Sequence, residues 1–353
     1  MSIFYNLIFV PLISIIIFPF TLIVFIIKPL EPIYNLLILV LENLSLYLSK
    51  ILFGKLVFYK LSYIIYLIYF LLILLYIFRT KKEYIILLFM FLIIHYFYPC
   101  IKNETYIKFI DVGQGDSILI HKDNKSILID TGGSLTNKGN ISNNTIIPLL
   151  KSYGINKIEY LILTHGDYDH MGEAINLVDN FKVEKVIFNC GPYNDLEQEL
   201  IKVLDKKKIK YYSCIKELNI DNNKLYFLQI KEYDNENDNS NVIYTELNGY
   251  KFMFMGDAGI EKEKDILEKY NISNIDVLKV GHHGSNTSSS KIFIDEINPK
   301  YSIISVGKNN RYGHPNKEAL DNLKNSKIYR TDQDGSIMFK IKNNKLKINT
   351  CSP

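Results

Sequence analysis

The chain has 353 residues, enough for two or three domains, and its composition changes abruptly near residue 100. The first hundred residues are almost entirely Ile, Leu, Phe, Tyr and Val, and they hold seven of the 41 basic and three of the 37 acidic residues. The remaining 34 basic and 34 acidic side chains balance, which excludes a strong overall attraction of this part to polyanions but leaves a local basic patch open. We therefore expect a membrane domain over 1–100 and a water-soluble domain over 101–353.

The membrane part contains apolar runs of about the length that crosses a bilayer, which is roughly 20 residues. The expected spans are Ile3 to Ile27, Leu61 to Phe78 and a short one from Tyr84 to Tyr98. Pro11 and Pro19 predict kinks in the first span. The stretch Ile33 to Phe53 places its polar residues on one face, which fits an amphipathic helix at the membrane surface or a further helix of a bundle.

The orientation of the membrane part follows from the basic loop Arg79-Thr-Lys81-Lys82. Basic loops between spans lie in the cytoplasm, and one more crossing through 84–98 then carries the chain outward. The sequence thus predicts a multi-pass protein of the cell membrane whose soluble domain lies on the outer face.

The soluble part alternates short strands and helices from residue 105 onward. Strands are expected over 106–110, 117–120, 126–129, 158–163, 185–188, 224–230, 242–247, 251–255 and 276–280, and helices over 146–153, 170–181, 261–270 and 317–325. The polar stretch 231–241 is predicted to be a solvated loop without a chemical role. The four cysteines stand far apart, so neither a zinc knuckle nor a disulfide pairing can be inferred.

Residues 164–170, Thr-His-Gly-Asp-Tyr-Asp-His, lie where an expected strand ends and a helix begins. This segment holds four possible metal ligands, which are His165, Asp167, Asp169 and His170. Imidazole and carboxylate groups are what a divalent transition metal binds at a catalytic centre. For Asp169 alone, an N-cap of the helix is an equally good explanation. The four together predict a metal site.

Two later strand ends carry the same residue types. Strand 251–255 runs into Gly256-Asp257, and strand 276–280 runs into Gly281-His282-His283-Gly284-Ser285. Asp257 alone is the kind of residue found in any turn. Because each of these strand ends resembles the first cluster in its chemistry, we expect them to converge on the same cation.

These motifs carry a resemblance to a known family. The series Asp130-Thr-Gly, His165-x-Asp167-x-Asp169-His170, Gly256-Asp257 and His282-His283 resembles the motif series of the metallo-β-lactamase fold. The segments Asp111-Val-Gly-Gln-Gly-Asp116, His282-His-Gly-Ser285 and Tyr312-Gly-His-Pro315 resemble the narrower ComEC family of competence proteins, over about residues 105–340. The resemblance implies N-terminal transmembrane helices, the last spans of that family's channel domain, followed by an α/β metallo-β-lactamase-like αββα sandwich.

The resemblance also implies a ligand set. One divalent ion is held by Asp169, His170, His283 and a shared Asp257, and a second, weaker one by His165 and Asp167. No histidine occurs between 170 and 282, so the position of the weaker ion lacks a usual ligand. A carboxylate-rich set suits one or two ions of Mn(II) or Zn(II), and also Mg(II). Asp130 is expected to orient a ligand histidine.

The candidate catalytic residues are Asp169, His282 and His314. His282 either contacts the leaving group or a phosphate oxygen, or hydrogen-bonds to a backbone carbonyl. His314 and Ser285 either line the mouth of the pocket or form a structural turn. The glycine-rich turn with Asp111, Gln114 and Asp116 either approaches the metals or is structural.

The predicted function is a membrane-anchored, metal-dependent hydrolase that cuts DNA phosphodiester bonds during DNA uptake in competence. DNA, the membrane and a separate polypeptide carrying the rest of the uptake channel are the expected partners. The family's N-terminal part is missing, which predicts a split gene product, a fragment or a specialised descendant. The alternatives are a hydrolase of a cell-envelope phosphodiester, such as a phosphocholine or teichoic-acid linkage, and a non-catalytic domain that docks on or gates a channel.

Overall fold

The structure, a computed structural model, describes residues 9–50, 57–102, 104–134, 141–220 and 222–351. The chain divides into two compact units, Met1–Leu56 and Val57–Pro353. The expected boundary between membrane and soluble domains lies inside the second unit, where the last apolar helix passes into the first strand.

The first unit contains two long helical segments. A π-helical stretch, η1 (Leu12–Ile17), begins directly after Pro11 and continues into α2 (Phe18–Ile26). The whole helix from Phe9 to Ile26 is long and apolar enough to cross a membrane, whereas residues 3–8 of the expected span lie outside the described residues. The 3-10 turn η2 (Lys28–Leu30) leads to α3 (Glu31–Lys50), the helix expected to be amphipathic.

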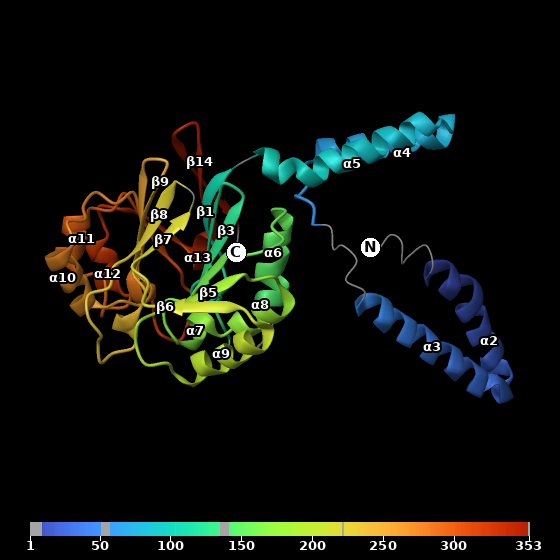
Figure 1. The fold of residues 1–353 in the computed structure, drawn as a ribbon, viewed down its shortest axis with the longest axis horizontal. Helices are drawn as coiled ribbons and strands as arrows, with labels where there is room; N and C mark the ends of the chain where they lie inside the picture. The colour runs from blue at the N-terminus through green and yellow to red at the C-terminus, as the bar shows by residue number, and fades with distance from the viewer. Residues whose placement is uncertain (1–8, 51–56, 103, 135–140, 221, 352–353) are drawn as a thin grey trace. The chain divides into compact units, whose positions relative to one another are not determined.

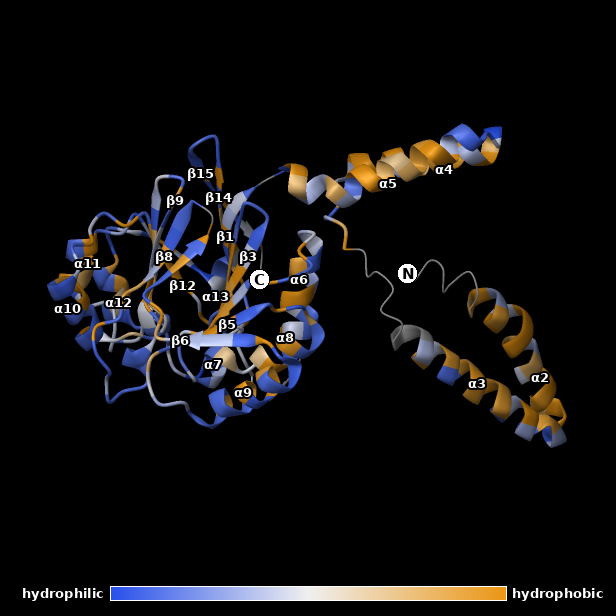
Figure 2. Ribbon diagram, viewed as in Figure 1, coloured by the Kyte–Doolittle hydropathy of each residue, from blue (hydrophilic) through white to orange (hydrophobic). Residues whose placement is uncertain are grey.

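The second unit opens with two further apolar helices, α4 (Tyr63–Arg79) and α5 (Lys82–Lys102), which are coloured mostly as hydrophobic in Figure 2. Only α5 reaches the length of a candidate span within the described part of this unit, because α4 has 17 residues. His95 of α5 is buried, and its Nδ1 lies 3.1 Å from the hydroxyl of Tyr69 on α4. This contact joins the two helices.

The soluble part contains two sheets packed face to face (Figure 1). The first has the order β15-β14-β1-β2-β3-β4-β5-β6. Its strands are β1 (Thr105–Phe109), β2 (Ile118–Lys122), β3 (Lys125–Ile129), β4 (Tyr160–Ile162), β5 (Lys185–Phe188), β6 (Lys210–Ser213), β14 (Ser336–Lys342) and β15 (Lys345–Cys351). Strands β3 to β6 are parallel, so the residues that follow β3 and β4 leave the sheet at the same edge.

The second sheet has the order β13-β12-β11-β10-β9-β8-β7. Its strands are β7 (Glu217–Ile220), β8 (Asn223–Phe227), β9 (Ile243–Leu247), β10 (Tyr250–Phe254), β11 (Val277–Lys279), β12 (Tyr301–Ile304) and β13 (Lys327–Arg330). Strands β10 to β13 are parallel. The segments after β10, β11 and β12 therefore also emerge at one edge.

Helices cover the outer faces of both sheets (Figure 1). The first sheet carries η3 (Ser142–Ile146), α6 (Ile147–Ser152), α7 (Tyr168–Met171), α8 (Ala174–Asn180) and α9 (Asp195–Lys207). The second carries α10 (Ile260–Lys269), α11 (Lys291–Ile297) and α12 (Lys317–Asn322), and a short α13 (Thr331–Asp334) precedes β14. The predicted αββα sandwich is confirmed. The single helix expected over 170–181 is two helices, because the chain turns at Gly172, where a Cβ would lie 2.4 Å from the carbonyl oxygen of Tyr168.

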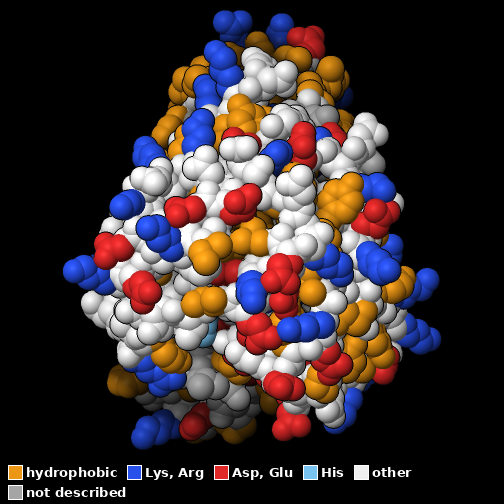
Figure 3. Space-filling model, turned by 90° about the vertical axis from the view of Figure 1, so that its left-hand side faces the viewer, with side chains coloured by type: hydrophobic (Ala, Val, Ile, Leu, Met, Phe, Trp, Pro, Cys, Tyr) orange, Lys and Arg blue, Asp and Glu red, His pale blue; other side chains and the backbone are white. Residues whose placement is uncertain are grey.

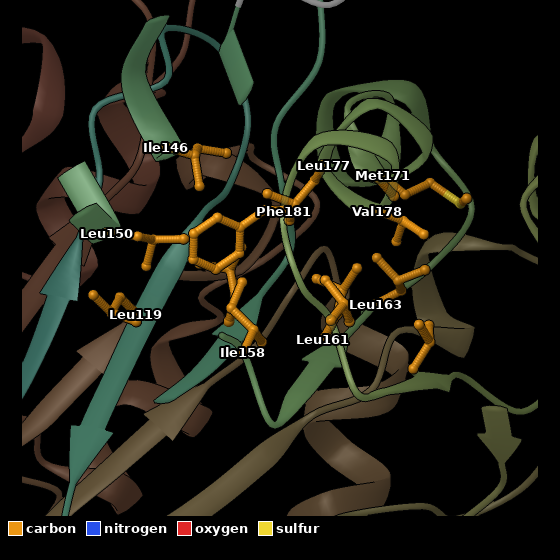
Figure 4. Close-up of a cluster of buried hydrophobic side chains, with 14 of the residues drawn as sticks. Leu119, Ile146, Leu150, Ile158, Leu161, Leu163, Met171, Leu177, Val178 and Phe181 are labelled. Atoms are coloured by element: carbon orange, nitrogen blue, oxygen red, sulfur yellow. The ribbon is translucent and has the colours of Figure 1, made fainter. Parts of the chain in front are cut away.

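The apolar core lies in three layers, between the sheets and under each set of helices. Figure 4 shows part of the layer beneath α8, where Phe181 and Leu177 meet Ile158 and Leu161 from the segment of β4. Burying such a side chain stabilises the fold by about 1.5–3 kcal/mol. This packing holds β4 in place and so positions the residues that follow it.

Candidate metal centre

The predicted ligand residues meet where parallel strands of both sheets end. Asp130 follows β3, and His165 to His170 follow β4 in the first sheet. Asp257 follows β10, and His283 lies in the turn η5 (Gly281–Gly284) after β11 of the second sheet. Ligands of α/β proteins commonly bind outside the carboxyl ends of parallel strands, and this site lies between two such edges.

The buried carboxylate of Asp130 holds the ring of His170 in place. Its Nδ1 lies 2.8 Å from Oδ2 of Asp130, and its Nε2 lies 3.1 Å from Oδ1 of Asp257. Asp130 is itself fixed, since it accepts hydrogen bonds from the backbone N–H and the hydroxyl of Thr164 at 2.8 and 2.6 Å. The expected contact between Asp130 and a histidine is therefore present, and it turns Nε2 of that histidine toward the other ligand candidates.

His283 enters the cluster from the second sheet. Its Nδ1 donates to the carbonyl oxygen of Ser305 at 2.7 Å, and its Nε2 lies 3.3 Å from Oδ2 of Asp169 and 3.6 Å from Oδ1 of Asp257. His283 has a left-handed φ of 53°, and Asp130 across the site has one of 58°. Such a backbone costs about 1–2 kcal/mol at a residue other than glycine, and strain of this kind gathers at functional sites.

The buried cluster contains polar atoms that lack a hydrogen-bond partner among the described residues. They are Nε2 of His165, His170 and His283 and Oδ1 of Asp116 and Asp257. The 3.1 Å approach of Nε2 of His170 to Oδ1 of Asp257 is a contact between ionisable groups and not a hydrogen bond. A buried polar atom without a hydrogen bond costs about 1–3 kcal/mol, so five of them in one cluster require an explanation. The same residues belong to sets whose possible ligand atoms lie within 4.8 Å of one another. Imidazole nitrogens and carboxylate oxygens in this arrangement fit a divalent metal ion.

Lys279 lies at this site although the sequence did not indicate it, and Asp116, whose role the sequence left open, lies beside it. Asp116 comes from the glycine-rich turn between β1 and β2, and its Oδ2 forms a salt bridge with the Lys279 ammonium. Lys279 is fully buried in β11, donates to the carbonyl oxygen of Gly256 at 3.1 Å and lies 4.0 Å from Oδ1 of Asp257. A lysine within the apolar strand Val277-Leu-Lys-Val280 was the signal that could have indicated this pair, because lysine is almost never fully buried without a partner.

The prediction that 231–241 is a solvated loop without a chemical role is wrong. Asp238 to Asn241 are buried, and the Ser240 hydroxyl lies 3.3 Å from Nδ1 of His165. The same hydroxyl accepts a hydrogen bond from the backbone N–H of Asp257 at 3.1 Å. Lys262 of α10 anchors the segment by donating to the carbonyl oxygens of Asp238 and Ser240. The loop thus positions one face of the metal cluster, and its polar composition reflects these contacts.

Three predicted site residues lie at the edge of the cluster. Asp167 is 45% exposed and lies 3.4 Å from Nε2 of His165. Nε2 of His282 is 3.8 Å from Oδ2 of Asp257, while its Nδ1 is 3.0 Å from the hydroxyl of Thr287 rather than at a backbone carbonyl. The rings of His314 and His282 have centroids 5.8 Å apart. None of the three belongs to the sets of closely spaced ligand atoms found among the described residues.

Ser285 and Asp111 take structural positions. Ser285 is buried, and its hydroxyl accepts a hydrogen bond from the backbone N–H of Thr287 at 3.3 Å. Asp111 accepts from the backbone N–H of Gly113 at 3.0 Å within its own turn. Asp116, by contrast, reaches the cluster because Gly115 lets the turn approach the backbone of Asp169, whose carbonyl oxygen would lie 2.0 Å from a Cβ there.

The buried imidazoles and carboxylates of the cluster stabilise each other's charged forms. Burial acts to lower the pKa of His170, but the Asp257 and Asp130 carboxylates outweigh it and hold that pKa well above its ordinary value. Burial acts to raise the pKa of Asp257, and the His170 and His283 imidazoles outweigh it and hold the pKa well below the usual range. Without a cation, protons on the histidines compensate the carboxylates.

We therefore expect the affinity for a divalent cation to fall as the pH is lowered from about 8 to about 6. The cation must displace the proton of His170, and since the pKa of that group is raised, the proton competes already near neutral pH. Below the raised pKa the affinity should fall about tenfold per pH unit for each proton displaced. Calorimetric titration with Mn(II) at both pH values measures this. The Asp130→Asn variant, which lowers the pKa of His170, should show a weaker pH dependence, and equal wild-type affinities at the two pH values would contradict the prediction.

Comparison with known proteins gives the class of this chain. Residues 110–308 match the family model described as the metallo-beta-lactamase superfamily. That match spans more than half of the chain, which belongs to this superfamily.

Within the superfamily, the chain is a homologue of the ComEC/ComA/Rec2 competence proteins. It is 33% identical over 267 residues to ComE operon protein 3 of Bacillus subtilis, 31% over 247 residues to Competence protein ComA of Neisseria gonorrhoeae, and 30% over 219 residues to Recombination protein 2 of Haemophilus influenzae. The matches cover 70%, 67% and 61% of this chain but 34%, 32% and 26% of those proteins. The chain therefore spans about a third or less of their length.

Several solved structures match the chain at low sequence identity and with TM-scores below 0.5. Igni18, a metallo hydrolase from the archaeon Ignicoccus hospitalis, has 15% identity and a TM-score of 0.44, with 67% of this chain and 100% of that chain covered. Zn²⁺-bound PqqB from Methylobacterium extorquens has 12% identity and a TM-score of 0.39, with 61% and 83% covered. At this identity the likeness concerns the fold alone.

Proposed function

We propose that the chain is a membrane-anchored, metal-dependent phosphodiesterase that cuts DNA during its uptake in competence. The observation that carries the hydrolase part is the set of buried imidazole and carboxylate atoms that lack a partner among the described residues and point into one space between the two sheets. The name of one relative, Competence protein ComA, supports a role in competence and so DNA as the substrate class.

The distances support a ligand assignment. Asp169, His170 and His283 would hold one ion together with Asp257, which stands between both histidines. His165, with Asp167 at the edge of the site, and again Asp257 would hold a second, weaker ion. When bound, such an ion, Mn(II), Zn(II) or Mg(II), would polarise a phosphoryl oxygen and lower the pKa of a water molecule to about 7.

His282 and His314 are assigned to substrate contact. Nδ1 of His282 lies 3.0 Å from the Thr287 hydroxyl, and its Nε2 faces Oδ2 of Asp257 at 3.8 Å. Burial lowers the pKa of His282, so the ring is neutral at neutral pH and can contact a phosphate oxygen without carrying a charge. Burial likewise lowers the pKa of His314, whose Nδ1 has no partner among the described residues. Asp169 is the ligand that faces the open side, with 31% of its side chain exposed.

Two alternatives have observations in their favour. A cell-envelope phosphodiester remains a candidate substrate because the soluble part has no basic excess, and Figure 3 shows acidic and basic side chains interspersed on one of its faces. A non-catalytic docking domain is supported by the poorer position of the weaker ion, where Asp167 is largely exposed.

One experiment separates these functions. The full chain, purified in detergent, is incubated with Mn(II), Zn(II) or Mg(II) and offered DNA, a small aryl phosphodiester and a phosphocholine ester. Cleavage of DNA that is lost in a folded Asp169→Ala variant supports the proposal. Turnover of the phosphocholine ester alone would assign an envelope substrate. Bound metal without turnover of any substrate would assign a docking role.

The outer-face orientation is also proposed here, and a disulfide supports it. Cys190, in the segment between β5 and α9, and Cys214, directly after β6, form a disulfide with Cα atoms 4.8 Å apart. Disulfides persist in oxidising environments outside the cytoplasm. Together with the basic loop at 79–82, this pairing favours an outer location of the soluble part.

The orientation predicts how cysteines react with a membrane-impermeant maleimide on intact cells. In a Cys100→Ser background, the exposed Cys351 should be labelled without permeabilisation, because the C-terminal strand lies outside. The matched control carries Thr80→Cys in the basic loop and Cys351→Ser, and it should be labelled only after permeabilisation. The reverse pattern would place the soluble domain in the cytoplasm.

A further inference from the structure

A cavity of about 410 Å³ opens beside the metal cluster. Asp169 is common to both, because it lies 3.3 Å from His283 and also lines the cavity. The other walls include Tyr168 at the start of α7, Gln114 of the β1–β2 turn, and Arg311 and Tyr312 from the segment between β12 and α12. A group bound in the cavity would therefore lie next to a phosphodiester bond that is held at the metal cluster.

Close backbone contacts fix the walls of this cavity. A Cβ on Gly133 would lie 2.0 Å from the carbonyl oxygen of Tyr168, and one on Gly307 would lie 2.7 Å from the backbone nitrogen of Gln114. Gly307 also donates to Oε1 of Gln114 at 3.2 Å. Residues other than glycine at these two positions would push the loops apart, so the cavity is part of the fold.

The segment that carries Arg311 and Tyr312 is braced by one side chain, Asn310. Its Nδ2 donates to the carbonyl oxygens of Gly307 and His314 at 3.2 and 2.7 Å. Its Oδ1 accepts from the backbone N–H groups of Tyr312 and His314 at 3.2 and 3.0 Å. Four hydrogen bonds from one side chain hold the Tyr312 backbone in place before any substrate binds, which reduces the entropy lost on binding.

The chemistry of the cavity rim is aromatic and cationic. The Tyr312 ring is 53% exposed, and the Arg311 guanidinium lies 5.0 Å from its centroid and donates to its hydroxyl at 2.9 Å. The segment 307–317 carries Lys308, Arg311 and Lys317 and no acidic residue, in a domain whose charges balance as a whole. This segment is a local basic patch, which the balanced overall charge does not exclude. An exposed aromatic ring beside an arginine is the usual platform for an unpaired base and its phosphate.

A row of rings connects this platform with the metal cluster. Tyr312 and His314 are stacked with centroids 5.9 Å apart, and His314 and His282 follow with centroids 5.8 Å apart. Nε2 of His282 lies 3.8 Å from Oδ2 of Asp257. A chain that binds along this row would pass from the platform to the ions.

We propose that this cavity is a nucleotide subsite in which an unpaired base stacks on Tyr312 while Arg311 contacts its phosphate, so that the enzyme accepts single-stranded rather than duplex DNA. The selectivity follows because bases inside a duplex are stacked on each other and offer no free face to a side chain. This inference rests on the phosphodiesterase function proposed above.

The test measures binding of fluorescent oligonucleotides to the full chain in detergent, with Mn(II) and with EDTA. Tyr312→Ala should weaken binding of a single-stranded 12-mer about tenfold, the scale of one lost base stack. Tyr312→Phe keeps the ring and should bind as the wild type does. The matched control is Tyr226→Ala, which removes another exposed tyrosine, on β8, and should have no effect. Arg311→Gln should weaken binding and reduce its dependence on salt.

Three outcomes would overturn the inference. They are unchanged binding in Tyr312→Ala, equal losses in Tyr312→Ala and Tyr226→Ala, and duplex binding at least as tight as single-strand binding. Melting temperature and metal content, measured for each variant, show whether it is folded. Failure of the proposed function gives a different result, because the wild type would then bind no metal or cleave no phosphodiester. Oligonucleotide binding in EDTA would still report on the subsite in that case.

Discussion

Replacing Asp257 by asparagine is expected to lower the affinity for the divalent ion by more than about 100-fold and to abolish phosphodiester hydrolysis, because losing a residue that only orients a ligand already costs about 10–100-fold. Asp257 has the largest expected effect because its Oδ1 lies 3.1 Å from Nε2 of His170 and 3.6 Å from Nε2 of His283. It is the carboxylate that stands between ligands from both sheets, and asparagine keeps its shape while removing its charge.

Metal content after dialysis and calorimetric titration measure the effect of Asp257→Asn, and a small aryl phosphodiester reports hydrolysis. Asp205→Asn makes the same chemical change at an exposed position of α9 and serves as the matched control. Full metal occupancy in Asp257→Asn would mean that the buried cluster is not where the ion binds.

Replacing Lys279 by methionine is expected to lower the free energy of unfolding by about 3–5 kcal/mol, the cost of breaking a buried ion pair on one side. The substitution leaves the Asp116 carboxylate buried without its cation and removes the donor to the carbonyl oxygen of Gly256. A loss of this size should lower the melting temperature of the full chain in detergent by about 10 °C or more.

The control for Lys279→Met is Lys291→Met, an exposed lysine at the start of α11, which should leave the melting temperature unchanged. A double variant, Asp116→Asn with Lys279→Met, removes both charges and should recover part of the lost stability. If the single and double variants melt together, the Asp116–Lys279 pair does not carry the stability assigned to it.

The parts of the site that could be predicted are those whose residues lie close together in the sequence. His165, Asp169 and His170 lie within six residues, so the turn after a single strand brings them together. Asp257 and His283 could be added because each directly follows an apolar strand, and parallel strands end at a common edge. Most strands between residues 105 and 280 were predicted for the same reason, since the hydrophobic pattern of each element is local. Helix α9 and strands β6 and β7, which lie in the same range, were not predicted.

The parts that were missed depend on contacts between distant segments. Ser240 touches His165 across 75 residues, and nothing in the polar sequence 231–241 distinguishes a loop that packs on the site from one in water. Strands β14 and β15 were not predicted, although apolar and polar residues alternate along much of both. They exist because β14 pairs with β1, which lies more than 200 residues earlier in the chain.

By itself, the sequence determined the division into apolar helices and a part of alternating strands and helices, and the kinds of groups available to a cation, because periodicity and motif spacing are properties of neighbouring residues. The αββα arrangement was implied by the resemblance of the motifs to a known family. Only the tertiary structure decided which of two adjacent histidines, His282 or His283, faces the buried ligands, and that Lys279 compensates Asp116. The physical reason is that burial and charge compensation are set by what packs against a group, and at this site those partners come from the other sheet.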